Sequence, residues 1–219
     1  TGANHASFLQ AVSEALAVAP TSALIAQRQR FAAEQTWVHR VRDLIASVDA
    51  LTLPRVSVVV VTYNNLELTK ACLHSIEIHS NYANLEVIVV DNASTDGTPA
   101  YLTTWVGNNE HRHVILNHDN RGFAAANNQG LAAATGDYLV MLNNDTYVTP
   151  GWVATLVGHM RRTAKLGMLG PVTNNIGNEA RIDIHYANMD EMLHVAADYT
   201  VRHVGQLTPL RTAAFFCVM

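Results

Sequence analysis

The sequence predicts an α/β fold with a mainly parallel sheet and helices on both of its faces. Two continuous β-branched runs, Val56–Thr62 and Leu85–Asp91, are typical of strands that are buried on both faces. Segments of helical period alternate with the strands, and this order favours parallel pairing through crossover helices. A chain of 219 residues, 49% of them hydrophobic, can bury a substantial core.

Residues 1–53 differ from the rest and predict an N-terminal helical appendage, followed by a second domain at 54–219. Residues 7–19 form one predicted helix, which Pro20 ends. Apolar residues then recur at helical spacing between arginines, so the segment predicts an amphipathic helical hairpin. Packing against the main domain or a neighbouring domain is the simpler interpretation. The alternative is that two copies pair through these helices as a homodimer.

After Pro54, strands and helices alternate. Helices are predicted at Leu66–His79, Thr98–Val106, 122–134 and 152–163, and further strands at 113–117, 138–142 and 167–172. Residues after 173 are polar and mixed, and only the apolar run at 213–219 predicts one more strand. A chain that ends in such a run is expected to be part of a longer protein.

Composition excludes several classes of protein. The formal net charge of −4 does not favour binding to nucleic acid or to a membrane surface through bulk charge. Cys72 and Cys217 are far apart, so neither a disulfide framework nor a CxxC metal site is expected, and a cytoplasmic location is the default. No apolar run reaches the roughly 20 residues of a transmembrane helix.

The first two predicted strands both end in short polar side chains. The residues concerned are Thr62, Tyr63, Asn64, Asp91, Asn92 and Ser94. Ligands of open α/β sheets bind at the carboxyl ends of the strands, where these groups could meet a ribose or a pyrimidine edge. The second stretch is also a plausible Asx turn and helix cap, and both interpretations can hold. The absence of a GxGxxG motif and of a Walker A loop disfavours dinucleotide-binding and P-loop proteins.

Two later stretches extend this pattern. Residues 120–130 combine small residues with amides, which suits close approach of a helix N-terminus to a phosphate, with Arg121 as a partner for diphosphate. Close helix–sheet packing alone would also explain the alanines. Asn143, Asn144 and Asp145 follow the fourth strand, where a carboxylate beside amides suits a divalent cation that is also held by a phosphate, although such residues also begin turns.

Four stretches together resemble glycosyltransferase family 2, the inverting sugar-nucleotide transferases of the GT-A fold. They are Val-Ser-Val-Val-Val-Val-Thr-Tyr-Asn from Val56, Val-Ile-Val-Val-Asp-Asn-Ala-Ser-Thr-Asp-Gly-Thr from Val87, Asn-Arg-Gly-Phe-Ala-Ala-Ala-Asn-Asn-Gln-Gly from Asn120, and Gly-Asp-Tyr-Leu-Val-Met-Leu-Asn-Asn-Asp from Gly136. The resemblance spans residues 56–172, roughly half of the chain. Asn143 stands where the family's Asp-x-Asp signature has its first acid, a variant that resembles the rhamnosyltransferase-like branch.

The resemblance implies a role for each matching residue. The base pocket and its uracil or thymine edge would involve Thr62, Tyr63, Asn64 and Asp91, with Asn92 and Ser94 beside them. The nucleotide would be flanked by Asn120, Gly122, Phe123 and Asn128, and the ribose and diphosphate by Asn143 and Asn144. Asp145 would bind Mn²⁺ or Mg²⁺.

The implied activity is metal-assisted transfer, with inversion, of a sugar from a UDP- or dTDP-sugar to a saccharide or lipid-linked acceptor, as in polysaccharide biosynthesis. The family's general base is expected beyond Met219, so this chain is expected to bind the donor and to lack the base. One alternative is a sugar-phosphate nucleotidyltransferase, which the loop after the first strand disfavours because it has neither glycine nor arginine. The other is a non-catalytic sugar-nucleotide-binding or assembly module. His185, His194 and His203 are expected to be surface histidines.

Overall fold

The computed structural model describes residues 5–17, 21–211 and 216–219, and it divides the chain into two compact units, residues 1–48 and 49–219. Each unit is considered by itself. The domain boundary between residues 53 and 54 stays a prediction.

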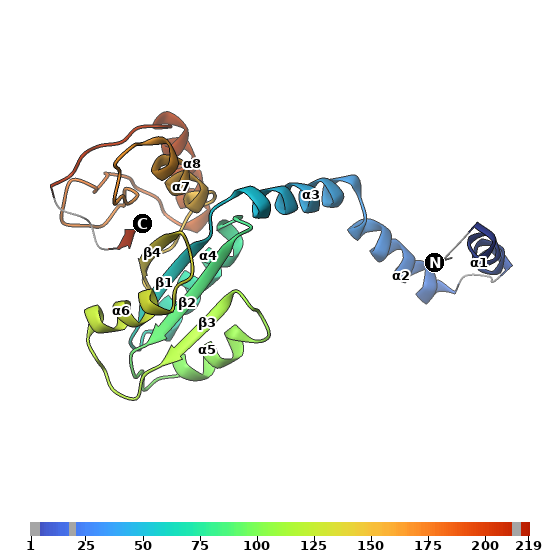
Figure 1. The fold of residues 1–219 in the computed structure, drawn as a ribbon, viewed down its shortest axis with the longest axis horizontal. Coiled ribbons are helices and arrows are strands. Elements are labelled where there is room, and N and C mark those ends of the chain that lie inside the picture. The colour runs from blue at the N-terminus through green and yellow to red at the C-terminus, as the bar shows by residue number, and fades with distance from the viewer. Residues whose placement is uncertain (1–4, 18–20, 212–215) are drawn as a thin grey trace. The chain divides into compact units, whose positions relative to one another are not determined.

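The N-terminal segment forms three helices, α1 (His5–Ala17), α2 (Ser22–Glu34) and α3 (Trp37–Thr52), where the sequence predicts one helix over residues 7–19 and then an amphipathic helical hairpin (Figure 1). Thr21 caps α2 as expected, because its side chain accepts the N–H of Leu24 at 3.2 Å. The predicted end of the first helix at Pro20 lies outside the described residues. No described residue of α2 is buried, so α2 does not pack as one arm of a hairpin.

The second unit contains a five-stranded sheet of order β3-β2-β1-β4-β5. The strands are β1 (Val56–Thr62), β2 (Leu85–Asp91), β3 (Arg112–Leu116), β4 (Tyr138–Asn143) and β5 (Cys217–Val218). The first four are parallel, and β5 pairs antiparallel with β4. Because β2 and β4 flank β1 on opposite sides, the chain reverses direction across the sheet between β1 and β4, which creates a topological switch point.

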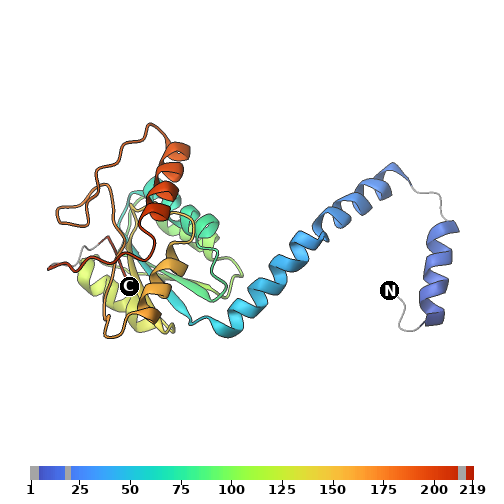
Figure 2. The same cartoon turned by 90° about the horizontal axis from the view of Figure 1, so that it is seen from above.

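Helices cover both faces of this sheet, which confirms the predicted fold class (Figures 1 and 2). Alternate residues of β1 point to opposite faces. On one face Val58 packs in a cluster with Leu73 of α4 (Leu66–His79) and Val153 of α7 (Trp152–Arg162), and α5 (Thr98–Val106) adds Leu102 to it. On the other face Val61 packs with Ala126 of α6 (Phe123–Ala133).

Gly130 allows α6 to approach the sheet closely, as its small residues predict. A Cβ atom at Gly130 would lie 2.3 Å from Cγ1 of Val59, which is fully buried in β1. Gly130→Ala is therefore expected to lower the free energy of unfolding by about 1–3 kcal/mol through overpacking, measured by urea denaturation. Gly158 of α7 is the matched control, because a Cβ there meets only the flexible end of Arg162. Gly158→Ala should be neutral or stabilising, and equal effects at the two positions would contradict the prediction.

One prediction for the C-terminal part is wrong, and one helix there was not predicted. Residues 167–172 form no strand, although Leu169 and Met219 exchange two backbone hydrogen bonds of 3.1 and 2.9 Å. The polar region after 173 contains a helix, α8 (Met189–Arg202), which Asn188 caps by accepting the N–H of Glu191 at 2.9 Å. Of the predicted last strand, residues 213–215 lie outside the described residues, and β5 is short.

Candidate functional site at the switch point

A pocket of about 370 Å³ lies at the carboxyl ends of β1 and β4. It is lined by Val61, Tyr63, Asn92, Asn120, Gly122, Phe123, Asn143, Asn144 and Asp145. Eight of these nine are predicted site residues, and Val61 is the addition. The pocket is therefore where the switch point of an open α/β sheet places a ligand.

Asn64 and Ser94 do not line the pocket but connect its two loops. The N–H of Asn64 donates to Oγ of Ser94 at 2.7 Å, and Oδ1 of Asn64 accepts the N–H of Thr95 at 2.8 Å. Asn64 has a φ of 58°, a left-handed conformation that asparagine tolerates better than most residues. These two residues shape the loops after β1 and β2, and this differs from the ligand contacts that the resemblance implies.

Thr62 is likewise buried beneath the pocket. Its hydroxyl lies 2.8 Å from that of Thr69 in α4. Nδ2 of Asn144 donates to Thr69 at 3.0 Å and to Thr62 at 3.3 Å. The Asn144 amide therefore holds the turn after β4 against α4, and this turn carries Asp145.

Asp91 is a buried carboxylate at the end of β2, with only 1% of its surface exposed. Its Oδ2 accepts the N–H of Ser94 at 3.0 Å, whereas its Oδ1 is buried without a hydrogen-bond partner among the described residues. A buried carboxylate oxygen without a donor is costly. A ligand with an N–H group could supply the missing donor.

Two aromatic side chains line the pocket from different elements. Tyr63 follows β1, Phe123 begins α6, and they are 48% and 49% exposed. Exposed aromatic rings suit stacking on a flat base. Asn128 is exposed and does not line the pocket, whereas Asn127 is buried and donates to the carbonyl of Phe123 at 2.9 Å.

Asp145 is the single acid among the lining residues, and it is exposed. In the part of the chain that the structure describes, no group of three or more His, Cys, Asp or Glu residues could hold a metal ion. One carboxylate beside the amides of Asn143 and Asn144 fits a hard cation such as Mg²⁺ or Mn²⁺, which takes its remaining ligands from water and phosphate. The donor set therefore fits a metal that arrives with a nucleotide.

Cys72 lies below this site and is chemically inert. Its Sγ lies 3.6 Å from the carbonyl oxygen of Asn143. Burial and, to a smaller extent, the charge of Asp145 raise the pKa of Cys72 to about 12, so the thiol stays protonated. None of the three C-terminal histidines lines the pocket. His185 is exposed beside Asp183, and the rings of His194 and His203 contact backbone carbonyls of α8 through Nδ1.

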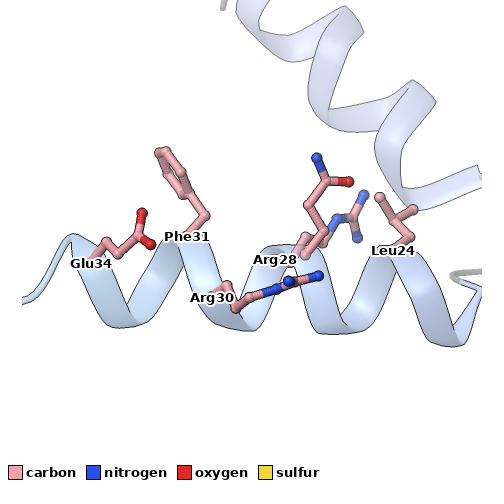
Figure 3. Close-up of a pocket in the computed structure, with 6 residues that line it drawn as sticks. Leu24, Arg28, Arg30, Phe31 and Glu34 are labelled. Carbon is pink, nitrogen blue, oxygen red and sulfur yellow. The ribbon is translucent and has the colours of Figure 1, made fainter. Parts of the chain in front are cut away.

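A larger depression of about 530 Å³ lies along α2 (Figure 3). It is lined by Leu24, Gln27, Arg28, Arg30, Phe31 and Glu34. All six residues belong to one helix without a buried residue, so this is an open helix surface. The switch-point pocket, although smaller, is the one that several strands and loops build together.

A polar pocket at the switch point of a mainly parallel sheet places this domain among the ligand-binding α/β proteins. Within this class, residues 57–216 match the model of glycosyl transferase family 2. The chain therefore belongs to this family, and the resemblance of its four motifs is confirmed.

Several curated relatives and solved structures are similar to parts of this chain. An uncharacterized glycosyltransferase of Haemophilus influenzae is 31% identical over 117 residues, 53% of this chain and 36% of that protein. Chondroitin synthase of Escherichia coli is 25% identical over 146 residues, 67% of this chain and 21% of that protein. A mannosyltransferase structure from Pyrobaculum calidifontis, in complex with GDP-Man and Mn²⁺, has 32% identity and a TM-score of 0.48, and the match covers 57% of this chain and 37% of that one.

The chain spans about a third or less of the length of these curated relatives. Among the described residues, no helix is both long and apolar enough to cross a membrane.

Proposed function

We propose that this domain binds a nucleoside diphosphate sugar as the donor site of a metal-assisted, inverting hexosyltransferase. One observation carries the proposal. A family 2 chain places the buried, unpartnered carboxylate oxygen of Asp91 at the end of β2, and the neighbouring pocket is lined by two exposed aromatic rings and a lone acid, although Asp91 itself is not one of the lining residues. Each of these features suits a different part of a sugar nucleotide.

The base would be recognised by Asp91, Tyr63 and Phe123. An unpartnered carboxylate oxygen accepts the ring N3–H of uracil or thymine, whereas the corresponding nitrogen of cytosine is itself an acceptor. The two aromatic rings would stack on the base. UDP- and dTDP-sugars are therefore the proposed donors.

The diphosphate would lie toward Asn143, Asn144 and Asp145, with Asp145 binding Mn²⁺ or Mg²⁺. When bound, such a metal neutralises the charge that develops on the leaving nucleoside diphosphate. Inversion requires a base that takes the proton of the acceptor hydroxyl. Asp145 is the one carboxylate that lines the pocket, so we propose that this base lies outside it.

Calorimetric titration of the chain with UDP and dTDP, with and without Mn²⁺, tests the proposal. We expect Mn²⁺ to tighten binding by about tenfold or more, because Asp145 would hold the ion and the ion would offset the charge of the diphosphate. Asp145→Ala should abolish this effect of Mn²⁺ and leave metal-free binding in place. The control is Asp183→Ala, because Asp183 is an exposed acid that does not line the pocket. Metal dependence that survives in Asp145→Ala would refute the assignment of the metal site.

The finer family assignment is also a proposal. The Asn-Asn-Asp-Thr sequence at 143–146 supports a rhamnosyltransferase-like branch, for which dTDP should bind more tightly than UDP in the same titration. A saccharide or lipid-linked saccharide is the proposed acceptor.

Homodimerisation through the N-terminal helices is supported by exposed apolar side chains on α3. They include Trp37, Val38, Val41, Leu44 and Ile45. Light scattering should give twice the mass of one chain, and Leu44→Glu should give a single chain because it places a charge in the interface. Ile78→Glu, at an exposed position on α4, is the control and should stay dimeric. A wild-type mass of one chain would rule out the dimer.

A further inference from the structure

One wall of the pocket is the loop of residues 117–122 between β3 and α6. Asn120 and Gly122 of this loop line the pocket, and Phe123 continues the wall at the start of α6. Side-chain amides hold the backbone of the loop. The N–H of Arg121 donates to Oδ1 of Asn92 at 3.0 Å, and the N–H of Gly122 donates to Oδ1 of Asn120 at 2.9 Å.

Asn92 lies at the centre of these contacts and is 3% exposed. Besides the N–H of Arg121, its Oδ1 accepts Nδ2 of Asn117 at 3.2 Å. Its own Nδ2 donates to Oδ1 of Asn120 at 2.7 Å. The Asn92 amide is thus engaged within the protein at both ends, although the residue lines the pocket. Asn120 contributes only its Oδ1 to these contacts, which leaves its Nδ2 donor for a ligand oxygen.

Asn117 and Gln129 form a reciprocal amide pair behind the loop. Nδ2 of Asn117 donates to Oε1 of Gln129 at 2.8 Å, and Nε2 of Gln129 donates to Oδ1 of Asn117 at 3.0 Å. The pair connects the residue after β3 to the middle of α6 and is partly buried. These two reciprocal hydrogen bonds fix both side-chain amides, so Asn117 is oriented to donate to Asn92 as well.

We propose that Asn92, Asn117 and Gln129 form an amide clamp that holds the 117–122 loop in its ligand-binding shape. They are positioning residues, because Asn117 and Gln129 do not line the pocket and Asn92 uses its amide oxygen and one of its two amide N–H donors inside the protein. A loop that is ordered before binding avoids the entropy loss of ordering it on the ligand. The inference rests on the proposed function for the identity of the ligand, a nucleoside diphosphate sugar.

Hydrogen exchange tests the clamp without any ligand. Gln129→Leu removes both bonds to Asn117, and we expect exchange of the Arg121 and Gly122 amides to accelerate by about tenfold, with β1 and β2 amides unchanged. The matched control is Asn109→Ala at the other end of β3, where the side chain accepts the N–H of His111 at 2.9 Å. This control should leave the loop amides unchanged. Unaltered exchange in Gln129→Leu would overturn the clamp, whether or not a nucleotide binds.

Titration with UDP and dTDP then tests the consequence for binding. Gln129→Leu should weaken nucleotide binding by about tenfold at a temperature at which the variant is fully folded, because the loop must then be ordered on binding. Gln129→Glu keeps the acceptor for Asn117 and should retain part of the affinity. Full affinity in a Gln129→Leu variant whose loop exchanges faster would overturn the positioning role. If the wild type binds neither nucleotide, the proposed function fails, and the exchange measurement alone decides the clamp.

Discussion

Replacing Glu86 with alanine is expected to lower the free energy of unfolding by about 3 kcal/mol. Glu86 is the second residue of β2, and its side chain is 1% exposed. It accepts hydrogen bonds from the hydroxyl of Ser57, from the N–H and hydroxyl of Thr135 at 2.7 and 2.9 Å, and from Arg55 at 2.9 Å. Alanine would leave these donors without their acceptor beside the core.

The same residue should make stability depend on pH. Burial alone raises the pKa of Glu86, but the hydrogen bonds from Ser57, Thr135 and Arg55 outweigh it and lower the pKa from 4.5 to about 2. Because the folded-state pKa is the lower one, the stabilisation is complete above about pH 5. It is lost as the pH falls toward 2, by an amount on the order of 3 kcal/mol.

Urea denaturation at pH 7 and at pH 3 measures both effects. Glu86→Gln keeps the shape of the side chain and should reduce the difference in stability between the two pH values. Glu67→Ala is the control, because Glu67 forms an exposed pair with Lys70, and its loss should cost less than about 1 kcal/mol. A Glu86→Ala variant as stable as Glu67→Ala would show that the buried hydrogen bonds contribute little.

Asp91→Asn is expected to weaken the binding of UDP by about 10- to 150-fold, which corresponds to one lost hydrogen bond to a charged acceptor of about 1.5–3 kcal/mol. The amide keeps the size of the carboxylate and can still accept the N–H of Ser94. Its NH₂ group would then face the ring N3–H of the base, a donor against a donor. The prediction rests on the buried Oδ1 of Asp91, which has no partner among the described residues.

A comparison of UDP with CDP sharpens this test. The wild type should prefer UDP, because the cytosine ring nitrogen would face the carboxylate as a second acceptor. Asp91→Asn should reduce or reverse the preference. The control is Asp137→Asn, which should bind like the wild type. In the wild type the Asp137 carboxylate accepts the N–H of Arg55, the residue before β1, at 2.8 Å. Unchanged UDP affinity and selectivity in Asp91→Asn would remove Asp91 from base recognition.

The regular part of the fold is predictable from local patterns. Val56–Thr62 and Leu85–Asp91 are strands with the predicted bounds, because β-branched runs between turn residues have few other stable conformations. The same holds for Leu66–His79 and Thr98–Val106 as helices. The missed helix α8 had a local signal as well. Asn188 is a typical N-cap residue, and Asp190 and Glu191 follow it in the first turn, where acids interact favourably with the positive end of the helix dipole.

The sequence by itself determined the succession of strands and helices along the chain and the polar residues at the carboxyl ends of the strands. It also determined the family to which the chain belongs. Only the tertiary structure decided how these residues divide between lining the pocket and supporting it. Asn64 and Ser94 are supports because they connect two loops about 30 positions apart in the sequence, and no local pattern records such a contact. Thr62 is a support because its hydroxyl meets Thr69 of α4 and the amide of Asn144. The tertiary structure also decided which residues form the amide clamp and which groups donate to the buried Glu86. Hydrogen bonds between distant residues form only when the sheet brings their strands together.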